Sequence, residues 1–240
     1  MLKKKTFIHQ NIPYSFNWNK LHHKEKYNQL TANREELNRL KNYFKNVYDG
    51  SIPNNLFNSR EFPRASQFKI KGIKVAFIRS FSKKLLRAGK IRYHDSNSKL
   101  PKYAQRVFDI YRKNNFRNIP GHEPILKNIL IKDKDSIAIE TPIWSEKKNK
   151  EITGHIDLIQ IENDVIKVID YKPEGNFLLS LPQVATYGFL VKSKLNLNKV
   201  SCVSFNKQGA WEYDPFILIK EIKEYLISYQ ITERPWEFFL

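Results

Sequence analysis

Three apolar segments in the second half of the chain constrain the fold most strongly. They run apolar or alternate with polar residues, and they are rich in β-branched side chains. They cover residues 136–144, 152–161 and 165–171. Because only the short polar stretches 146–150 and 162–164 separate them, we expect three consecutive antiparallel strands.

The elements after these strands complete the predicted core. A helix over about residues 182–192, a strand around Cys202 and a helix that begins at Asp214-Pro215 follow in the sequence. The order of elements is therefore βββαβα. It places residues 118–240 in the α/β (α+β) class, with a central mixed sheet flanked by helices.

Helical spacing dominates the first half. Apolar residues recur at that spacing over residues 31–48 and 101–115. The first of these segments has Thr31 or Asn33 as its predicted N-cap and Gly50 at its end. We therefore expect residues 1–117 to form a mainly helical, basic region that precedes the core.

The turn between the second and third strands fixes how these strands pair. If Asn163 and Asp164 are the two central residues of a hairpin turn, Asp157 lies directly opposite Asp170. Two carboxylates then face each other across neighbouring strands.

The preceding turn decides the position of a third carboxylate. If Lys148 and Asn149 are its central residues, Glu140 lies opposite Asp157. One additional turn residue would move Glu140 to the other face of the sheet. With two-residue turns, three carboxylates line up across one face.

A row of carboxylates on neighbouring strands calls for a compensating charge, because like charges so placed destabilise a sheet. Mg²⁺ binds carboxylate oxygens and commonly shares its shell with substrate phosphate. Lys172 follows Asp170 by two residues and so projects from the same face. In phosphodiester hydrolysis, the metal polarises the phosphate and activates a water, and a lysine can hold that water or offset developing charge.

Three motifs in this region carry a family resemblance. They are Gly154-His155-Ile156-Asp157, Asp170-Tyr171-Lys172 and Gln183-Val184-Ala185-Thr186-Tyr187. The series resembles the G-x-x-D, D-x-K and Q-x-x-x-Y motifs of the RecB-like branch of PD-(D/E)xK nucleases. The segment around Glu140 is similar to the one that precedes G-x-x-D in nucleases of the mitochondrial genome maintenance exonuclease type. The resemblance covers about residues 120–205.

The resemblance implies a restriction-endonuclease-like core and a Mg²⁺-dependent DNA nuclease, with Mn²⁺ able to substitute. The implied substrates are single strands or DNA ends in repair, recombination or replication. The implied site residues are Asp157 and Asp170 as metal ligands, Glu140 as an assisting ligand, Lys172 as the catalytic lysine, and Gln183 and Tyr187 as helix residues that approach the site or the DNA. CRISPR-associated relatives carry iron–sulfur cysteines, whereas Cys202 is the only cysteine here, so no cluster is expected.

RecB-like nucleases usually carry a further histidine ligand on a helix well before G-x-x-D. His94 and His122 are the candidates for that ligand, and Glu123 is a weaker one. His155 shares a strand face with Asp157 and is a candidate contact for the substrate.

Charge favours a polyanionic partner. Lys and Arg number 42 against 24 Asp and Glu, a net charge of +18, although a lysine-rich, AT-biased genome would have the same effect. Residues 64–94 contain no Asp or Glu, and Lys83, Lys84 and Arg87 in this stretch are candidate phosphate contacts. Alternatively, the aromatic and aliphatic residues among them form the buried side of an amphipathic helix.

The distribution of apolar residues indicates where in the cell the protein lies. No apolar stretch is long enough to span a membrane, and the basic start is not followed by an apolar run, so we expect a cytoplasmic protein without export.

Two other functions fit the same residues. One is a non-catalytic nucleic-acid-binding protein with a vestigial nuclease fold, and the other is an RNA-directed nuclease.

Overall fold

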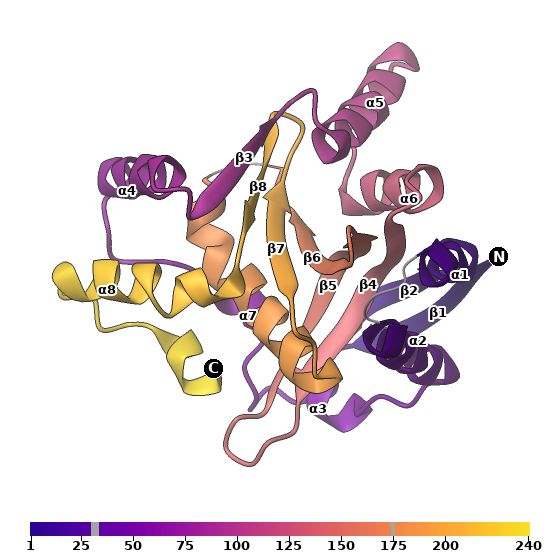
Figure 1. Ribbon diagram of the computed structural model, residues 1–240, viewed down its shortest axis with the longest axis horizontal. Coiled ribbons are helices and arrows are strands. Elements are labelled where there is room, and N and C mark those ends of the chain that lie inside the picture. Colours follow the sequence, from indigo (N-terminus) through magenta and orange to yellow (C-terminus); the bar gives the residue numbers. More distant parts are fainter. Residues whose placement is uncertain (30–33, 174–175) are drawn as a thin grey trace.

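A computed structural model describes residues 1–29, 34–173 and 176–240 (Figure 1). Its described part has one eight-stranded sheet in the order β1-β2-β4-β5-β6-β7-β8-β3. The strands are β1 (Leu2–His9), β2 (Ile12–Asn19), β3 (Ile91–Asp95), β4 (Ser136–Ser145), β5 (Ile152–Glu162), β6 (Val165–Tyr171), β7 (Val200–Phe205) and β8 (Gly209–Tyr213). Neighbouring strands pair antiparallel except β6 and β7, which pair parallel, so the sheet is mixed as predicted.

Helices flank this sheet, which confirms the α+β class. They are α1 (Lys20–Gln29), α2 (Arg34–Asp49), α3 (Asn54–Asn58), α4 (Val75–Arg87), α5 (Lys99–Lys113), α6 (His122–Lys132), α7 (Phe177–Leu195) and α8 (Glu221–Ser228). Three 3₁₀ helices are η1 (Ala65–Gln67), η2 (Pro215–Leu218) and η3 (Pro235–Phe239). The predicted N-cap at Thr31 or Asn33 lies outside the described residues. Gly50 ends α2 with a positive φ of 89°, as expected. No helix in the described ranges is both long and apolar enough to cross a membrane.

The prediction of a mainly helical first half missed three strands. β1 and β2 form a hairpin around Gln10 and Asn11, both at positive φ, and β2 then pairs with β4. β3 closes the other edge of the sheet against β8. The sheet therefore contains strands from both regions into which we divided the sequence.

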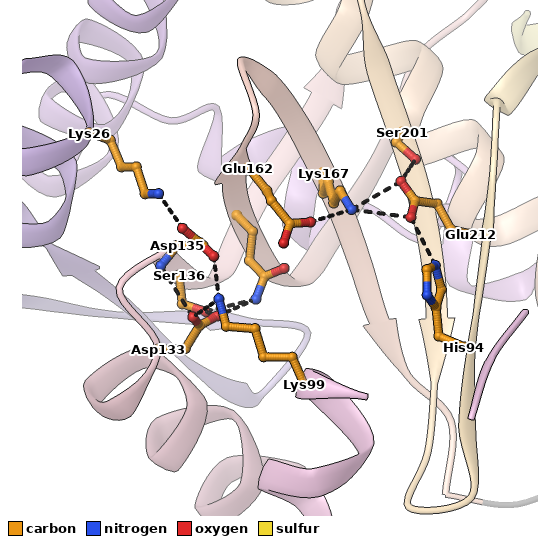
Figure 2. A network of polar contacts seen from close by, with 11 residues as sticks. Lys26, His94, Lys99, Asp133, Asp135, Ser136, Glu162, Lys167, Ser201 and Glu212 are labelled. Carbon is orange, nitrogen blue, oxygen red and sulfur yellow. Dashed lines mark hydrogen bonds and ion pairs between the residues drawn. The ribbon is translucent and has the colours of Figure 1, made fainter. Parts of the chain in front are cut away.

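Each face of the sheet has its own apolar cluster. Successive residues of one strand can belong to different clusters, as Val168 and Ile169 of β6 do. One cluster joins the sheet to α5 and α6, and the other joins it to α2, α4, α7 and α8 (Figure 1). Ion pairs also hold helices α1 and α5 to the sheet. Lys26 of α1 and Lys99 of α5 both contact Asp135, just before β4 (Figure 2).

The predicted strand register is confirmed. Leu158 pairs with Ile169, which makes Asp157 and Asp170 the next opposed positions. Asn163 and Asp164 form the turn with φ values of 49° and 60°. Positive φ at both central residues is the geometry of a two-residue hairpin turn.

The register between β4 and β5 also matches the prediction. Ile139 pairs with Leu158 and Thr141 pairs with Ile156, so Glu140 and Asp157 lie opposite each other between these pairs. The turn is centred on residues 148–149, as expected.

Candidate active site

A pocket of about 200 Å³ opens where β4, β5 and β6 meet α6 and α7. Its lining residues are Tyr14, Arg64, Ser66, His122, Glu140, His155, Asp157, Asp170, Lys172, Gln183 and Tyr187. The fold thus brings together the whole predicted carboxylate row, the lysine, the two helix residues and one of the two candidate histidines. Tyr14, Arg64 and Ser66 were not among the predicted site residues.

The ladder between β4 and β5 is interrupted at the carboxylates. Glu140 has a φ of 51°, which is unusual for a non-glycine residue in a strand, and the pair that it would form with Asp157 is missing from the ladder. The faces change at this point, because Leu158 packs in the α5–α6 cluster whereas Ile156 packs in the opposite one. Residues two apart on a regular strand share a face. The interruption therefore re-aims both carboxylates, although the register is the same on either side of them.

Asp170 is the centre of a hydrogen-bonded group. Its side chain is buried, and Lys172 Nζ lies 2.6 Å from its Oδ2. Gln183 connects the group, since its Nε2 donates to Asp170 Oδ1 at 3.2 Å and to the Tyr187 hydroxyl oxygen at 3.3 Å. Lys172 Nζ in turn donates to Gln183 Oε1 at 3.0 Å. The i, i+4 spacing of Gln183 and Tyr187 on α7 thus serves to orient the lysine and the carboxylate.

Asp157 and His122 meet at the backbone of Tyr171. The Tyr171 N–H donates to Asp157 Oδ2 at 2.8 Å, and His122 Nε2 lies 3.1 Å from the Tyr171 carbonyl oxygen. His122 Nε2 is also 3.9 Å from Asp157 Oδ2. A ring nitrogen that donates to a carbonyl leaves the other nitrogen unprotonated, which is the usual arrangement of a histidine metal ligand. Burial lowers the pKa of His122 and favours that neutral form.

Glu140 has no side-chain hydrogen bond or ion pair with any described residue. Burial, followed by the charges of Asp170 and Glu123, raises its pKa to about 7. Backbone strain at a carboxylate that has no partner is a pattern found at functional sites.

The three carboxylates have few cationic partners among the described residues. Burial is the main cause that raises the pKa of Asp157 well above its ordinary range, and the charges of Asp170 and Glu140 add to it. Burial likewise raises the pKa of Asp170 against the opposing effect of Lys172. Within the described ranges, only Asp170 of the three carboxylates pairs with a lysine or arginine, and no three His, Cys, Asp or Glu side chains are spaced to hold a metal ion. The donor set is nevertheless oxygen-rich and anionic, which is the chemistry that Mg²⁺ prefers.

His155 lies on the pocket wall in an aromatic cluster. Its Nδ1 is 3.2 Å from Arg64 Nη2, its Nε2 is 2.9 Å from His9 Nδ1, and its ring stacks on Tyr14 at 3.7 Å between centroids. Burial, with the charges of His9 and Arg64, holds the pKa of His155 well below its usual value. The ring is therefore neutral at physiological pH, and Nδ1 accepts from the guanidinium.

His94 lies elsewhere, so it is not a candidate ligand of this pocket. Its Nε2 is 3.2 Å from Glu212 Oε2 on the neighbouring strand β8. Figure 2 shows that Glu212 also contacts Lys167, which bridges it to Glu162. Of the two candidate histidines, only His122 reaches the carboxylates.

The basic residues predicted to hold phosphates lie on α4. Lys83, Lys84 and Arg87 are exposed, and none of them lines the pocket. The opposite side of α4 is buried through Ile78, Phe81, Ser82 and Leu85, so the helix is amphipathic. The apolar residues of this stretch therefore serve mainly as core, while Phe77 remains 43% exposed beside the cations.

Gly154 has a steric role in the site. A Cβ placed on it would lie 2.3 Å from Tyr187 Cε1, so the tyrosine can reach Gln183 only across a glycine. We expect Gly154→Ala to lower the free energy of unfolding by about 1–3 kcal/mol, as overpacking does, measured by urea denaturation. Gly121→Ala is the matched control, because no atom of the described ranges lies within 4 Å of its added Cβ. Equal stability of the two variants would contradict this packing.

Comparisons with known proteins do not identify a family for this chain. No protein-family model matches the chain, and a search of curated proteins finds no match either.

Proposed function

We propose that this protein is a Mg²⁺-dependent DNA nuclease whose sheet is a restriction-endonuclease-like core. The observation that carries the proposal is the convergence of Glu140, Asp157, Asp170 and Lys172 on one pocket, at the interruption of the β4–β5 ladder. Structural carboxylates are normally paired or solvated, whereas two of these three, Glu140 and Asp157, are half-buried without a cationic partner in the described part of the chain. A bound divalent cation accounts for that arrangement.

The three carboxylates would hold the metal, and His122, whose Nε2 is taken up by the Tyr171 carbonyl, would offer its Nδ1 as a nitrogen ligand. Mg²⁺ suits the carboxylate oxygens, and Mn²⁺ would tolerate the histidine as well. When bound, such an ion supplies Lewis-acid polarisation of a phosphate oxygen and a water of lowered pKa.

Lys172 would act on the attacking water or on the charge that develops at phosphorus. Its ammonium is fixed by Asp170 Oδ2 and Gln183 Oε1, so little reorganisation is needed when a substrate arrives. Gln183 is a positioning residue in this scheme, because it contacts both members of the Asp170–Lys172 pair. Tyr187 supports the glutamine from the next turn of α7.

DNA is the proposed partner on the basis of charge. The net charge of +18 and the exposed cations of α4 favour a polyanion. Exposed Phe77 on the same helix offers a ring on which an unpaired base can stack. Single strands or DNA ends are therefore the proposed substrates, with roles in repair, recombination or replication.

The test uses purified protein with labelled single-stranded DNA, double-stranded DNA and RNA, each with Mg²⁺, Mn²⁺ or EDTA. We expect DNA to be cut with either metal and not with EDTA. Tight binding without cleavage under every condition would instead identify a non-catalytic nucleic-acid-binding protein, and preferential cleavage of RNA would identify an RNA-directed nuclease. End-blocked DNA in the same assay separates exonuclease from endonuclease activity.

A further inference from the structure

Arg64 lines the same pocket as the carboxylates, yet it is not within ion-pair distance of any carboxylate in the described part of the chain. Its Nη2 donates to the Tyr14 hydroxyl at 2.9 Å and to His155 Nδ1 at 3.2 Å. Neither acceptor is a carboxylate. The positive charge of the guanidinium is thus oriented but not neutralised.

The hydrogen-bonding capacity of Arg64 is only partly used. A guanidinium has five N–H donors, and the buried Nε of Arg64 has no acceptor among the residues that the structure describes. Nη1 has only a contact of 3.5 Å to Gln10 Oε1. A buried donor without a partner costs free energy, so an arginine in this state suits a ligand that brings acceptor oxygens.

The backbone and the ring cluster fix where Arg64 points. Arg64 forms an isolated bridge with Thr153 of β5, and the Thr153 N–H donates to the carbonyl of Pro63 at 3.3 Å. The guanidinium lies over the Tyr14 ring at 5.4 Å from its centroid. Tyr14 stacks on His155, which is two residues from Asp157 on the same strand. The cation is therefore held in place before any ligand arrives.

We infer that Arg64, with Tyr14 and His155 as its positioning residues, forms a phosphate-binding subsite beside the carboxylate row. This inference rests on the proposed function, because the phosphate belongs to the bound DNA strand. Arginine forms charge-assisted hydrogen bonds with phosphate oxygens, and Nη1 of Arg64, which has only the 3.5 Å contact to Gln10, keeps donors for them. The phosphate is either internal to the strand or at its end.

The test measures binding of a labelled single strand in Mg²⁺ by Lys172→Ala protein, so that cleavage does not interfere. Adding Arg64→Gln is expected to raise the Kd about ten- to a hundredfold and to reduce the salt slope by about 0.7, the value for one phosphate contact on a single strand. Arg64→Lys should keep the salt slope while losing part of the affinity. Arg60→Gln is the matched control, because Arg60 is exposed in the same loop and does not line the pocket.

Strands with a 5′-phosphate, a 3′-phosphate or hydroxyls at both ends distinguish the two sources of phosphate. A loss that is equal for all three identifies an internal phosphate, and a loss confined to one end identifies a terminal one. The subsite is refuted if Arg64→Gln and Arg60→Gln proteins with the same melting temperature share the same Kd and salt slope. If Arg64→Gln does not fold, an unchanged Kd for Arg64→Lys refutes it. Because these readouts are of binding, they remain informative even if the wild-type protein fails to cleave.

Discussion

Replacing Lys172 with alanine is expected to lower the rate of DNA cleavage by about a hundred- to ten-thousandfold while leaving DNA affinity within a few-fold of wild type. The ammonium is the only cation paired with a carboxylate of the row in the described part of the chain, and Asp170 and Gln183 hold it in place. Its loss removes a group that acts on the transition state more than on the bound strand. Single-turnover cleavage at saturating protein, together with the Kd, separates these two effects.

Lys167→Ala is the control for this experiment. Lys167 lies on β6, the strand that Lys172 directly follows, and it also forms ion pairs, but its partners are Glu162 and Glu212, and it does not line the pocket (Figure 2). Its removal should leave the cleavage rate nearly unchanged at temperatures where the variant is folded. Equal loss of activity in both variants would point to general destabilisation instead of catalysis by Lys172.

Glu140→Gln is expected to stabilise the metal-free protein at neutral pH. In the folded chain the pKa of Glu140 is raised from its ordinary value of 4.5 to about 7. Between these two values the folded state holds a proton that the unfolded state has released. The wild-type protein therefore loses stability as the pH rises from about 4.5 to about 7. Above pH 7 the glutamine variant should be more stable by about 1–3 kcal/mol, and the difference should vanish near pH 4.

Urea denaturation in EDTA at pH 4 and pH 8 measures this difference. Glu61→Gln is the control, because Glu61 is exposed and outside the pocket. Saturating Mg²⁺ should then stabilise the wild-type protein more than Glu140→Gln, since a ligand that binds the folded state stabilises it according to its affinity. A glutamine variant that is less stable than wild type in EDTA at pH 8 would show that Glu140 is a structural residue.

Comparing Glu140→Gly with Glu140→Gln separates the effect of the charge from that of the backbone strain. Glutamine removes only the charge. Glycine tolerates the φ of 51° that Glu140 adopts, so Glu140→Gly relieves the strain as well as the charge.

The central strands were predictable because their signals are local. Alternation of apolar residues located β4, β5 and β6, and the turn residues Asn163 and Asp164 fixed the register that brings Asp157 opposite Asp170. The interruption at Glu140 was not predictable from alternation. The face on which the strand buries its residues changes there, as Ile156 and Leu158 show, and no run of neighbouring residues encodes that change.

The edge strands escaped prediction for a different reason. β1 carries three consecutive lysines, which protect an exposed edge from pairing with other chains but make the segment look like a basic leader. Because β1 and β2 were missed, Tyr14 was missed as well. Arg64 stood out only as one of many cations, and its place in the pocket depends on a bridge to β5 that is distant in sequence.

His94 and His122 illustrate the same limit. Both were candidate ligands by their distance from G-x-x-D in the sequence. His94 proved to lie on a strand whose partner, β8, carries Glu212, whereas His122 lies in the first turn of α6 next to Asp157. Spacing along the chain could not distinguish them, because the choice depends on how the sheet is ordered.

Cleavage of an end-labelled single strand by wild-type and Asp170→Asn proteins, each titrated with Mg²⁺ and then with EDTA, tests the proposed metal site most directly. Asparagine keeps the shape of the buried Asp170 side chain and an oxygen acceptor for Gln183, but it removes the charge that would hold the ion. We expect wild-type cleavage to rise to saturation with Mg²⁺ and to stop with EDTA, and the variant to bind the strand without cutting it at any Mg²⁺ concentration. Equal cleavage by both proteins, or cleavage by wild type that persists in EDTA, would contradict a metal-dependent nuclease site at these residues.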